Sequence, residues 1–376
     1  MSVIHRIALA SVTSAGVLAA AALAVAPAAS AQTHMPSSFI GNFHKLKTIG
    51  STVPKNGDVN PYGTVVIRHS QGKLQRGNVL ISNFNNANNL QGTGTTIVQV
   101  SPAGKLSTFA HIRRQLPGAC PGGVGLTTAL ATLNGGWVVV GSLPTTNGMS
   151  ATAKAGCLIV LDSHGNVRET IAGHGINGPW DMTAISNRHL AELFVTNVLN
   201  GTVAASPKTV HKGTVVRLVL GLHGTSTPKL LVSTTIGSGF GERTDPAALV
   251  VGPTGVGLNS RGTLFVADSV GNRITAIRNA LFRQGSGGTG RMVTKNGALN
   301  TPLGLAVAPN GDVLTVNAGD GKLLETTPGG KQVATRLLDN TGTPPGNGAL
   351  FGLAVAPHGS GVYYVDDAAN TLRLLH

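Results

Sequence analysis

Residues 253–268 read PTGVGLNSRGTLFVAD, and the same pattern returns in residues 302–317 as PLGLAVAPNGDVLTVN. Residues 350–366 give a third copy, LFGLAVAPHGSGVYYVD, with one extra residue after Gly359. Each copy contains a turn that ends in glycine, an apolar strand, a second turn, and a β-branched or aromatic strand that ends on Asp or Asn. Because the copies begin 49 and then 48 residues apart, they indicate a repeat architecture of antiparallel strands.

Three weaker copies precede these and begin within residues 61–63, 121–126 and 179–182. In all six copies the second strand ends on a small polar residue, and these residues are Asn83, Ser142, Asn197, Asp268, Asn317 and Asp366. Further strands follow in each copy, and the loops between them vary in length. The sequence therefore predicts an all-β fold, a single six-bladed β-propeller of four-stranded antiparallel blades.

The last copy is one strand short, since residues 372–375 form its third strand. Residues 43–49, FHKLKTI, have the pattern of a strand that belongs to no copy. Pairing of this N-terminal strand beside the last copy would close the ring and remove the exposed strand edges. We therefore expect residues 32–376 to form one domain, although length alone would suggest two.

Residues 1–31 have the features of a cleaved signal peptide. Arg6 gives a basic start, residues 7–25 form an apolar run, and Ala29-Ser30-Ala31 supplies the small residues that a signal peptidase needs. An uncleaved anchor is the alternative, because the apolar run is long. We expect cleavage before Gln32 and a periplasmic or secreted monomer with no transmembrane segment in the mature chain.

The chain has two cysteines, Cys120 and Cys157. An oxidising compartment favours a disulfide, and the repeat register places both residues near the same end of the second copy. The alternative is a pair of unpaired, partly buried thiols.

The formal net charge is +14, and it is +13 once Arg6 is removed with the signal peptide. A positive surface attracts acidic partners, such as an envelope polymer, anionic lipid or nucleic acid. The basic residues are scattered, however, so a general surface bias or an acidic habitat explains the charge equally. For an exported chain we expect no nucleic acid as partner, but a small molecule or an envelope component.

The strand–turn pattern, with VADSVGNRI at residues 266–274, resembles the NHL repeat class of six-bladed propellers, including SMP-30-like proteins. The resemblance covers essentially the whole mature chain and is closest in the last three copies. It implies a fold rather than one function, because this architecture includes lactonases, lyases and pure interaction modules.

In gluconolactonase and SMP-30 propellers, the positions before the turn glycine carry Glu, Asn and Asp that hold a divalent metal over the central channel. The similar positions here are Tyr62, Gly122, Trp180, Thr254, Leu303 and Phe351. Four of them are aromatic or Leu, and Asp181 is the one nearby carboxylate, whereas Ca²⁺ needs several oxygen ligands. We therefore predict no cofactor, with a divalent metal as the alternative.

These positions indicate an apolar channel mouth that binds a flat or apolar ligand or a sugar ring. The predicted ligand-binding residues are Tyr62, Trp180, Asp181, Asp245, Thr254 and Phe351. The alternative is that the large side chains pack between blades. The six polar strand ends form a second ring, which we interpret as structural, since Asp and Asn there bond neighbouring backbone N–H groups.

Irregular loops hold the candidate catalytic groups. Residues 237–245 offer Glu242 as a general base and Arg243 as an anion clamp, and His174 lies in the loop before the third copy. A local ion pair and a solvent-facing histidine are the structural alternatives. We predict an exported, non-catalytic propeller that binds a small ligand or partner at its channel face. The alternative is a lyase or lactonase-like hydrolase with a non-standard site.

Overall fold

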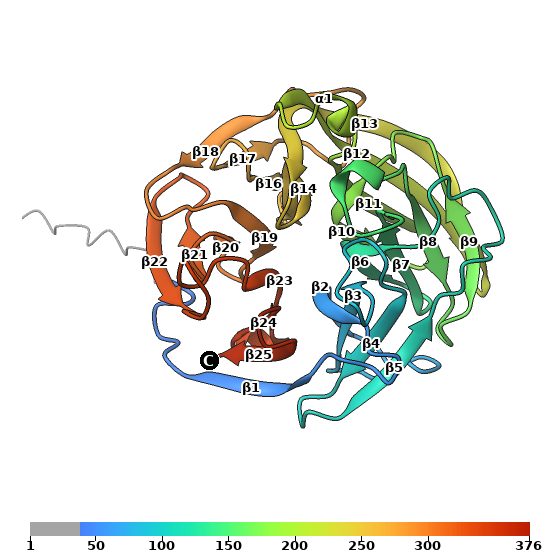
Figure 1. Cartoon of the computed structure of the whole chain (residues 1–376), viewed down its shortest axis with the longest axis horizontal. Coiled ribbons are helices and arrows are strands. Elements are labelled where there is room, and N and C mark those ends of the chain that lie inside the picture. Colours follow the sequence, from blue (N-terminus) through green and yellow to red (C-terminus); the bar gives the residue numbers. More distant parts are fainter. Residues whose placement is uncertain (1–37) are drawn as a thin grey trace, which may run out of the picture. The chain divides into compact units, whose positions relative to one another are not determined.

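The computed structural model describes residues 38–376, and the predicted signal peptide therefore lies outside the described residues. Six antiparallel sheets surround a central axis, with β2, β10, β19 and β23 among the strands nearest to it (Figure 1). This arrangement confirms the predicted six-bladed propeller. In the described part of the chain, no helix is long and apolar enough to cross a membrane.

The first three blades contain the following strands. Blade one has β2 (Val59–Val66), β3 (Val79–Asn85), β4 (Thr96–Val100) and β5 (Leu106–His111). Blade two has β6 (Leu126–Leu133), β7 (Trp137–Ser142), β8 (Cys157–Leu161) and β9 (Val167–Ile171). Blade three has β10 (Pro179–Ser186), β11 (Leu190–Asn197), β12 (Val210–His223), β13 (Ser226–Asp245) and β14 (Leu249–Val251). Blade three thus has five strands instead of the predicted four, because the chain reverses after the long β13 and β14 pairs antiparallel with the end of β13.

The last three blades have four strands each. Blade four has β15 (Pro253–Leu258), β16 (Leu264–Asp268), β17 (Arg273–Ile277) and β18 (Arg291–Lys295). Blade five has β19 (Pro302–Val307), β20 (Val313–Asn317), β21 (Lys322–Thr326) and β22 (Gln332–Leu337). Blade six has β23 (Leu350–Val355), β24 (Val362–Asp366), β25 (Thr371–Leu375) and β1 (Leu46–Ser51). The short helices are α1 (Thr202–Ala205) and two 3₁₀ turns, Ser150–Thr152 and Pro357–Gly359.

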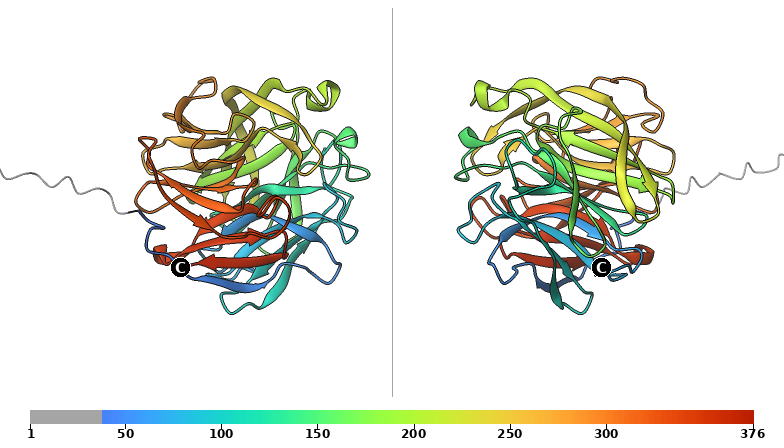
Figure 2. Two further views of the ribbon diagram at one scale, coloured as in Figure 1. Left: turned by 60° about the vertical axis from the view of Figure 1, so that its left-hand side comes forward. Right: turned by 90° about the vertical axis from the view of Figure 1, so that its right-hand side faces the viewer.

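Strand β1 closes the ring as predicted. It pairs antiparallel with β25, from Leu46 opposite Leu375 to Ser51 opposite Thr371. Figures 1 and 2 show the blue β1 beside the red strands of the C-terminal blade. The last blade therefore receives its outermost strand from the start of the described chain, and this strand covers the outer edge of β25.

The six polar strand ends occupy one equivalent position and are structural, as expected. Five of them pair with the first residue of the inner strand of their blade, for example Asp268 with Pro253 and Asn317 with Pro302. Asn83 pairs with Pro61, the third residue of β2. They are buried, and their side chains fasten the loops. Asp268 accepts hydrogen bonds from the Gly271 N–H and from Arg273 Nε at 2.8 Å.

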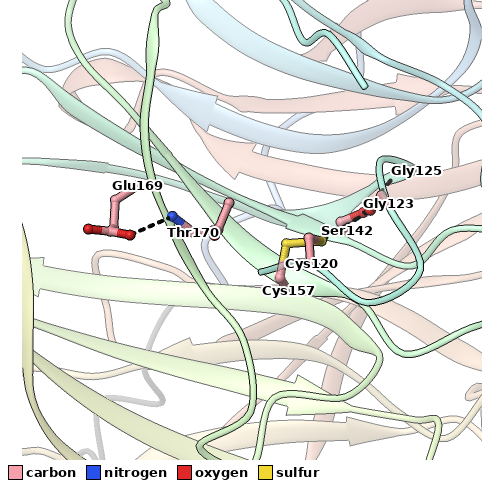
Figure 3. Close-up of a disulfide and its surroundings, with 7 residues drawn as sticks. All are labelled: Cys120, Gly123, Gly125, Ser142, Cys157, Glu169 and Thr170. Carbon is pink, nitrogen blue, oxygen red and sulfur yellow. Dashed lines mark hydrogen bonds between the residues drawn. A yellow bond between two sulfur atoms is a disulfide. The ribbon is translucent and has the colours of Figure 1, made fainter. Parts of the chain in front are cut away.

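Blade two departs from the predicted register. Its inner strand starts at Leu126, which pairs with Ser142, so Gly122 lies in the preceding loop rather than on the channel. That loop is fastened by a disulfide between Cys120 and Cys157, the predicted pair (Figure 3). Beside it, the Ser142 hydroxyl donates to the Gly123 carbonyl at 2.8 Å and accepts from the Gly125 N–H.

Glycines in the inner strands allow the blades to meet backbone against backbone. A Cβ atom at Gly255, Gly304 or Gly352 would overlap the main chain of the neighbouring inner strand. The repeated glycine therefore allows the inner strands of successive blades to approach closely, because glycine has no side chain to separate the two backbones.

Candidate ligand-binding channel

One end of the channel is closed by three aromatic side chains. Tyr62, Trp180 and Phe351 are 1%, 2% and 4% exposed. The ring of Tyr62 stacks on Phe351 with centroids 4.2 Å apart and meets Trp180 edge-on at 5.8 Å. Leu249 and Leu303 belong to the same apolar cluster. We call these five residues the channel plug.

The plug corrects the prediction of an apolar mouth on this face. The aromatic side chains pack into the core, which is the alternative that the sequence left open. Thr254 is also fully buried, and its hydroxyl lies 2.8 Å from the Ser269 hydroxyl and 3.2 Å from the carbonyl oxygens of Ala267 and Pro302. These residues stabilise the propeller and are not accessible to a ligand from this end.

The plug residues do not fit a divalent cation. A hard cation needs several oxygen ligands around an accessible position. In the described residues, no group of three or more His, Cys, Asp or Glu side chains is arranged to hold a metal ion. Thr254, the hydroxyl that the ring supplies besides Tyr62, already has protein partners. We therefore derive no chemistry through a metal at this end.

The opposite end of the channel contains a cavity of about 750 Å³. The inner strands of all six blades line it, through residues such as Thr128, Ala184 and Ala354. Its outer lining includes Arg68 and Asn134, which lie in turns between the first and second strands of their blades. The cavity is thus reached from the face on which those turns lie, and it ends below the plug.

Asp181 lies among the lining residues, next to plug residue Trp180 in the chain. In the repeat register it occupies the position of Gly63, Gly255, Gly304 and Gly352 in four other blades. Its carboxylate accepts hydrogen bonds from the Met182 N–H at 2.8 Å and from the Val256 N–H at 3.2 Å. Val256 belongs to the next blade, so the Asp181 side chain bridges two neighbouring inner strands. At the equivalent glycine positions the two backbones are in direct contact instead.

Burial dominates the electrostatics of Asp181. It raises the pKa of the carboxyl to about 8, while the hydrogen bonds from Met182 and Val256 oppose the rise. The carboxyl is therefore largely protonated near pH 7, and it can then donate a hydrogen bond as well as accept one.

The candidate catalytic residues lie elsewhere. Glu242 is buried on β13, accepts a hydrogen bond from the Asn200 N–H at 2.9 Å, and has its pKa raised to about 7 by burial. Arg243 forms an ion pair with Asp245 at 2.8 Å. His174 is exposed in its loop. None of these four residues lines the cavity, and the Arg243–Asp245 ion pair and the exposed His174 match the structural alternatives.

The fold and the channel define the class first. The chain is a six-bladed β-propeller whose channel has the plug at one end and the cavity at the other. No family model matches the sequence, and no curated protein matches it either.

Particular solved structures resemble it. A gluconolactonase from Xanthomonas campestris is 14% identical, with a TM-score of 0.55 over 89% of this chain and 90% of that one. Regucalcin from Agrobacterium tumefaciens, a calcium-binding protein, is 12% identical, with a TM-score of 0.53 over 87% and 93%. A putative gluconolactonase is 16% identical, with a TM-score of 0.53 over 88% and 91%. At these identities the likeness shows the fold alone.

Asp181 was a predicted ligand-binding residue, but the cavity that it lines was not predicted. Two signals were present in the repeat. A carboxylate stands where four other copies have glycine, and Ala131, Ala184, Ala306 and Ala354 place small side chains along the inner strands.

Proposed function

We propose that this chain is an exported ligand-binding propeller that takes a small organic molecule into its central channel. The observation that carries the proposal is the cavity of about 750 Å³ that ends at the buried Asp181. This volume lies within the range of cavities that hold metabolite-sized ligands. Because the plug closes the other end of the channel, a ligand enters from the face that carries the turns between the first and second strands of the blades.

Asp181 supplies the polar contact at the closed end. As a protonated acid it donates to a carbonyl or hydroxyl oxygen of the ligand, and as a carboxylate it accepts from a hydroxyl or amine. The inner strands add backbone groups and small apolar side chains around the body of the ligand. Few polar anchors inside a concave site are typical of small-molecule binding.

A channel-blocking variant tests the proposal. Ala354 lines the cavity, and Ala354→Trp places a large side chain inside it, whereas Ala354→Ser is a matched control that leaves it open. We would screen sugars, sugar lactones and aromatic acids by thermal shift and native mass spectrometry. A ligand at about 100 times its Kd adds roughly 2.7 kcal/mol of stability. Binding to wild type and Ala354→Ser but not to Ala354→Trp is expected, and equal binding to all three contradicts the proposal.

A second candidate is a lyase or hydrolase that uses Asp181 as its acid or base. A cavity carboxyl with a pKa of about 8 suits proton transfer near neutral pH. An assay of glucono-1,5-lactone hydrolysis, monitored through the acid that the reaction releases, tests this second candidate. Turnover by wild type that Asp181→Asn abolishes would favour the enzyme, and binding without turnover would favour the ligand-binding protein.

A further inference from the structure

The two ends of the propeller differ in charge. In antiparallel blades, the turns between first and second strands lie at the same end as the turns between third and fourth strands. We call this end, where the cavity opens, the mouth face. Its turns contain nine basic residues, namely Arg68, Lys73, Arg76, Lys105, Arg188, Arg261, Arg278, Arg283 and Lys331.

These cations are not neutralised by neighbouring carboxylates. The same turns contain two acidic residues, Asp162 and Asp312, and Asp312 is buried. Within the described part of the chain, none of the nine cations forms an ion pair with a carboxylate within 4.0 Å. The mouth face therefore carries a net positive charge that is open to solvent.

The opposite end is nearly balanced. Its loops contain four aspartates, Asp58, Asp320, Asp339 and Asp367. The same loops contain five basic residues, Lys55, Arg113, Arg114, Lys154 and Lys208. The excess of basic over acidic residues is therefore larger in the turns of the mouth face, nine against two, than in the loops of the opposite end, five against four.

Large apolar side chains accompany the cations on the mouth face. Phe282 is 77% exposed in the loop between Arg278 and Arg283, and Arg283 holds that loop by donating to the Arg278 and Gly285 carbonyls. Ile185 and Leu190 are both more than 40% exposed and flank the turn that contains Arg188. Exposed aromatic and aliphatic tips beside basic residues are typical of surfaces that lie on membranes.

We propose that the mouth face docks on an anionic lipid surface, with Phe282 inserted at the headgroup level and the cations against the lipid phosphates. Charge complementarity supplies the attraction, since basic residues near an anionic leaflet each strengthen association. A soluble polyanion would bind the cations but gives no role to the exposed Phe282, Ile185 and Leu190. The proposal does not depend on whether a ligand occupies the channel.

Vesicle sedimentation tests this docking, with lipid vesicles of phosphatidylcholine alone and of phosphatidylcholine with half phosphatidylglycerol. The charge variant is Arg188→Gln with Arg261→Gln, both exposed turn residues. The matched control is Lys154→Gln with Lys208→Gln, which removes the same charge from the opposite end. Phe282→Ser tests the apolar contact.

Wild type should bind the anionic vesicles and not the neutral ones, and less tightly as salt rises. Loss of two contacting cations should weaken binding roughly 10- to 30-fold, at about fivefold per charge. The control should bind like wild type, and Phe282→Ser more weakly. Equal loss in the control, no vesicle binding, or binding only to soluble polyphosphate would overturn the proposal. Melting curves of each variant separate these results from misfolding.

Discussion

Replacement of the channel carboxyl tests the burial of Asp181 directly. The folded state holds its proton up to a pKa of about 8, whereas in the unfolded chain an aspartate ionises near pH 4. Because the folded pKa is raised, the stabilisation from protonation is fully present below about pH 4. It is lost as the pH rises toward 8. Between these limits unfolding releases one proton from this group.

The magnitude follows from that single proton. Each pH unit inside the window changes the free energy of unfolding by about 1.4 kcal/mol per proton. From pH 5 to pH 7 the Asp181 contribution should therefore fall by about 2.7 kcal/mol. Asp181→Asn cannot titrate, so the stability difference between wild type and variant should change by this amount. Glu242, Asp312 and Asp367 have pKa values raised to about 7, but they titrate in both proteins and cancel.

Urea unfolding at pH 5, 6 and 7, followed by tryptophan fluorescence, measures this difference, since Trp137 and Trp180 are both buried. Asp181→Gly is a second variant, because glycine occupies the same position in four other blades. It also lacks the titrating group and should show the same pH trend. A stability difference that stays constant from pH 5 to pH 7 would refute the raised pKa and the role of Asp181 as a protonated anchor.

Three further predictions concern stability. Replacing Cys120 and Cys157 by Ser opens a cross-link of 37-residue separation and should cost about 4 kcal/mol by the chain-entropy relation; identical unfolding midpoints for both proteins would contradict this. Trp180→Ala should cost about 3–5 kcal/mol in chemical unfolding because it empties the plug; a loss below 1 kcal/mol would mean that the plug collapses without cost. Glu325→Ala removes the carboxylate that accepts hydrogen bonds from the Ser38 hydroxyl and from the Phe39 and Ile40 N–H groups. Limited proteolysis should therefore cut this N-terminal segment faster than in wild type. Unchanged cutting would show that other contacts hold the segment.

The fold was predictable because its determinants are repeated in the chain. Each copy places a turn glycine, two apolar strands and a polar strand end in the same order, so six copies specify six blades. The closing strand was predictable because residues 43–49 have a strand pattern and the last copy lacks one strand. Blade two was misread around Gly122, since its glycines belong to a disulfide-fastened loop and mimic the turn pattern.

The candidate site was only partly predictable. The repeat identified Asp181 as the one carboxylate near the channel, and it identified the aromatic positions. It could not indicate that Tyr62 packs against both Trp180 and Phe351 in a buried cluster that also contains Leu249. The place of Leu249 in this cluster depends on how the chain reverses between β13 and β14.

The sequence by itself determined the number of blades, the closing strand and the polar residues that fasten the loops, because these depend on short-range patterns. Only the tertiary structure decided which end of the channel is open, and it also gathered scattered basic residues onto that end. Both features depend on the directions of side chains and loops from different blades. Those directions are set by packing between segments that are far apart in the chain.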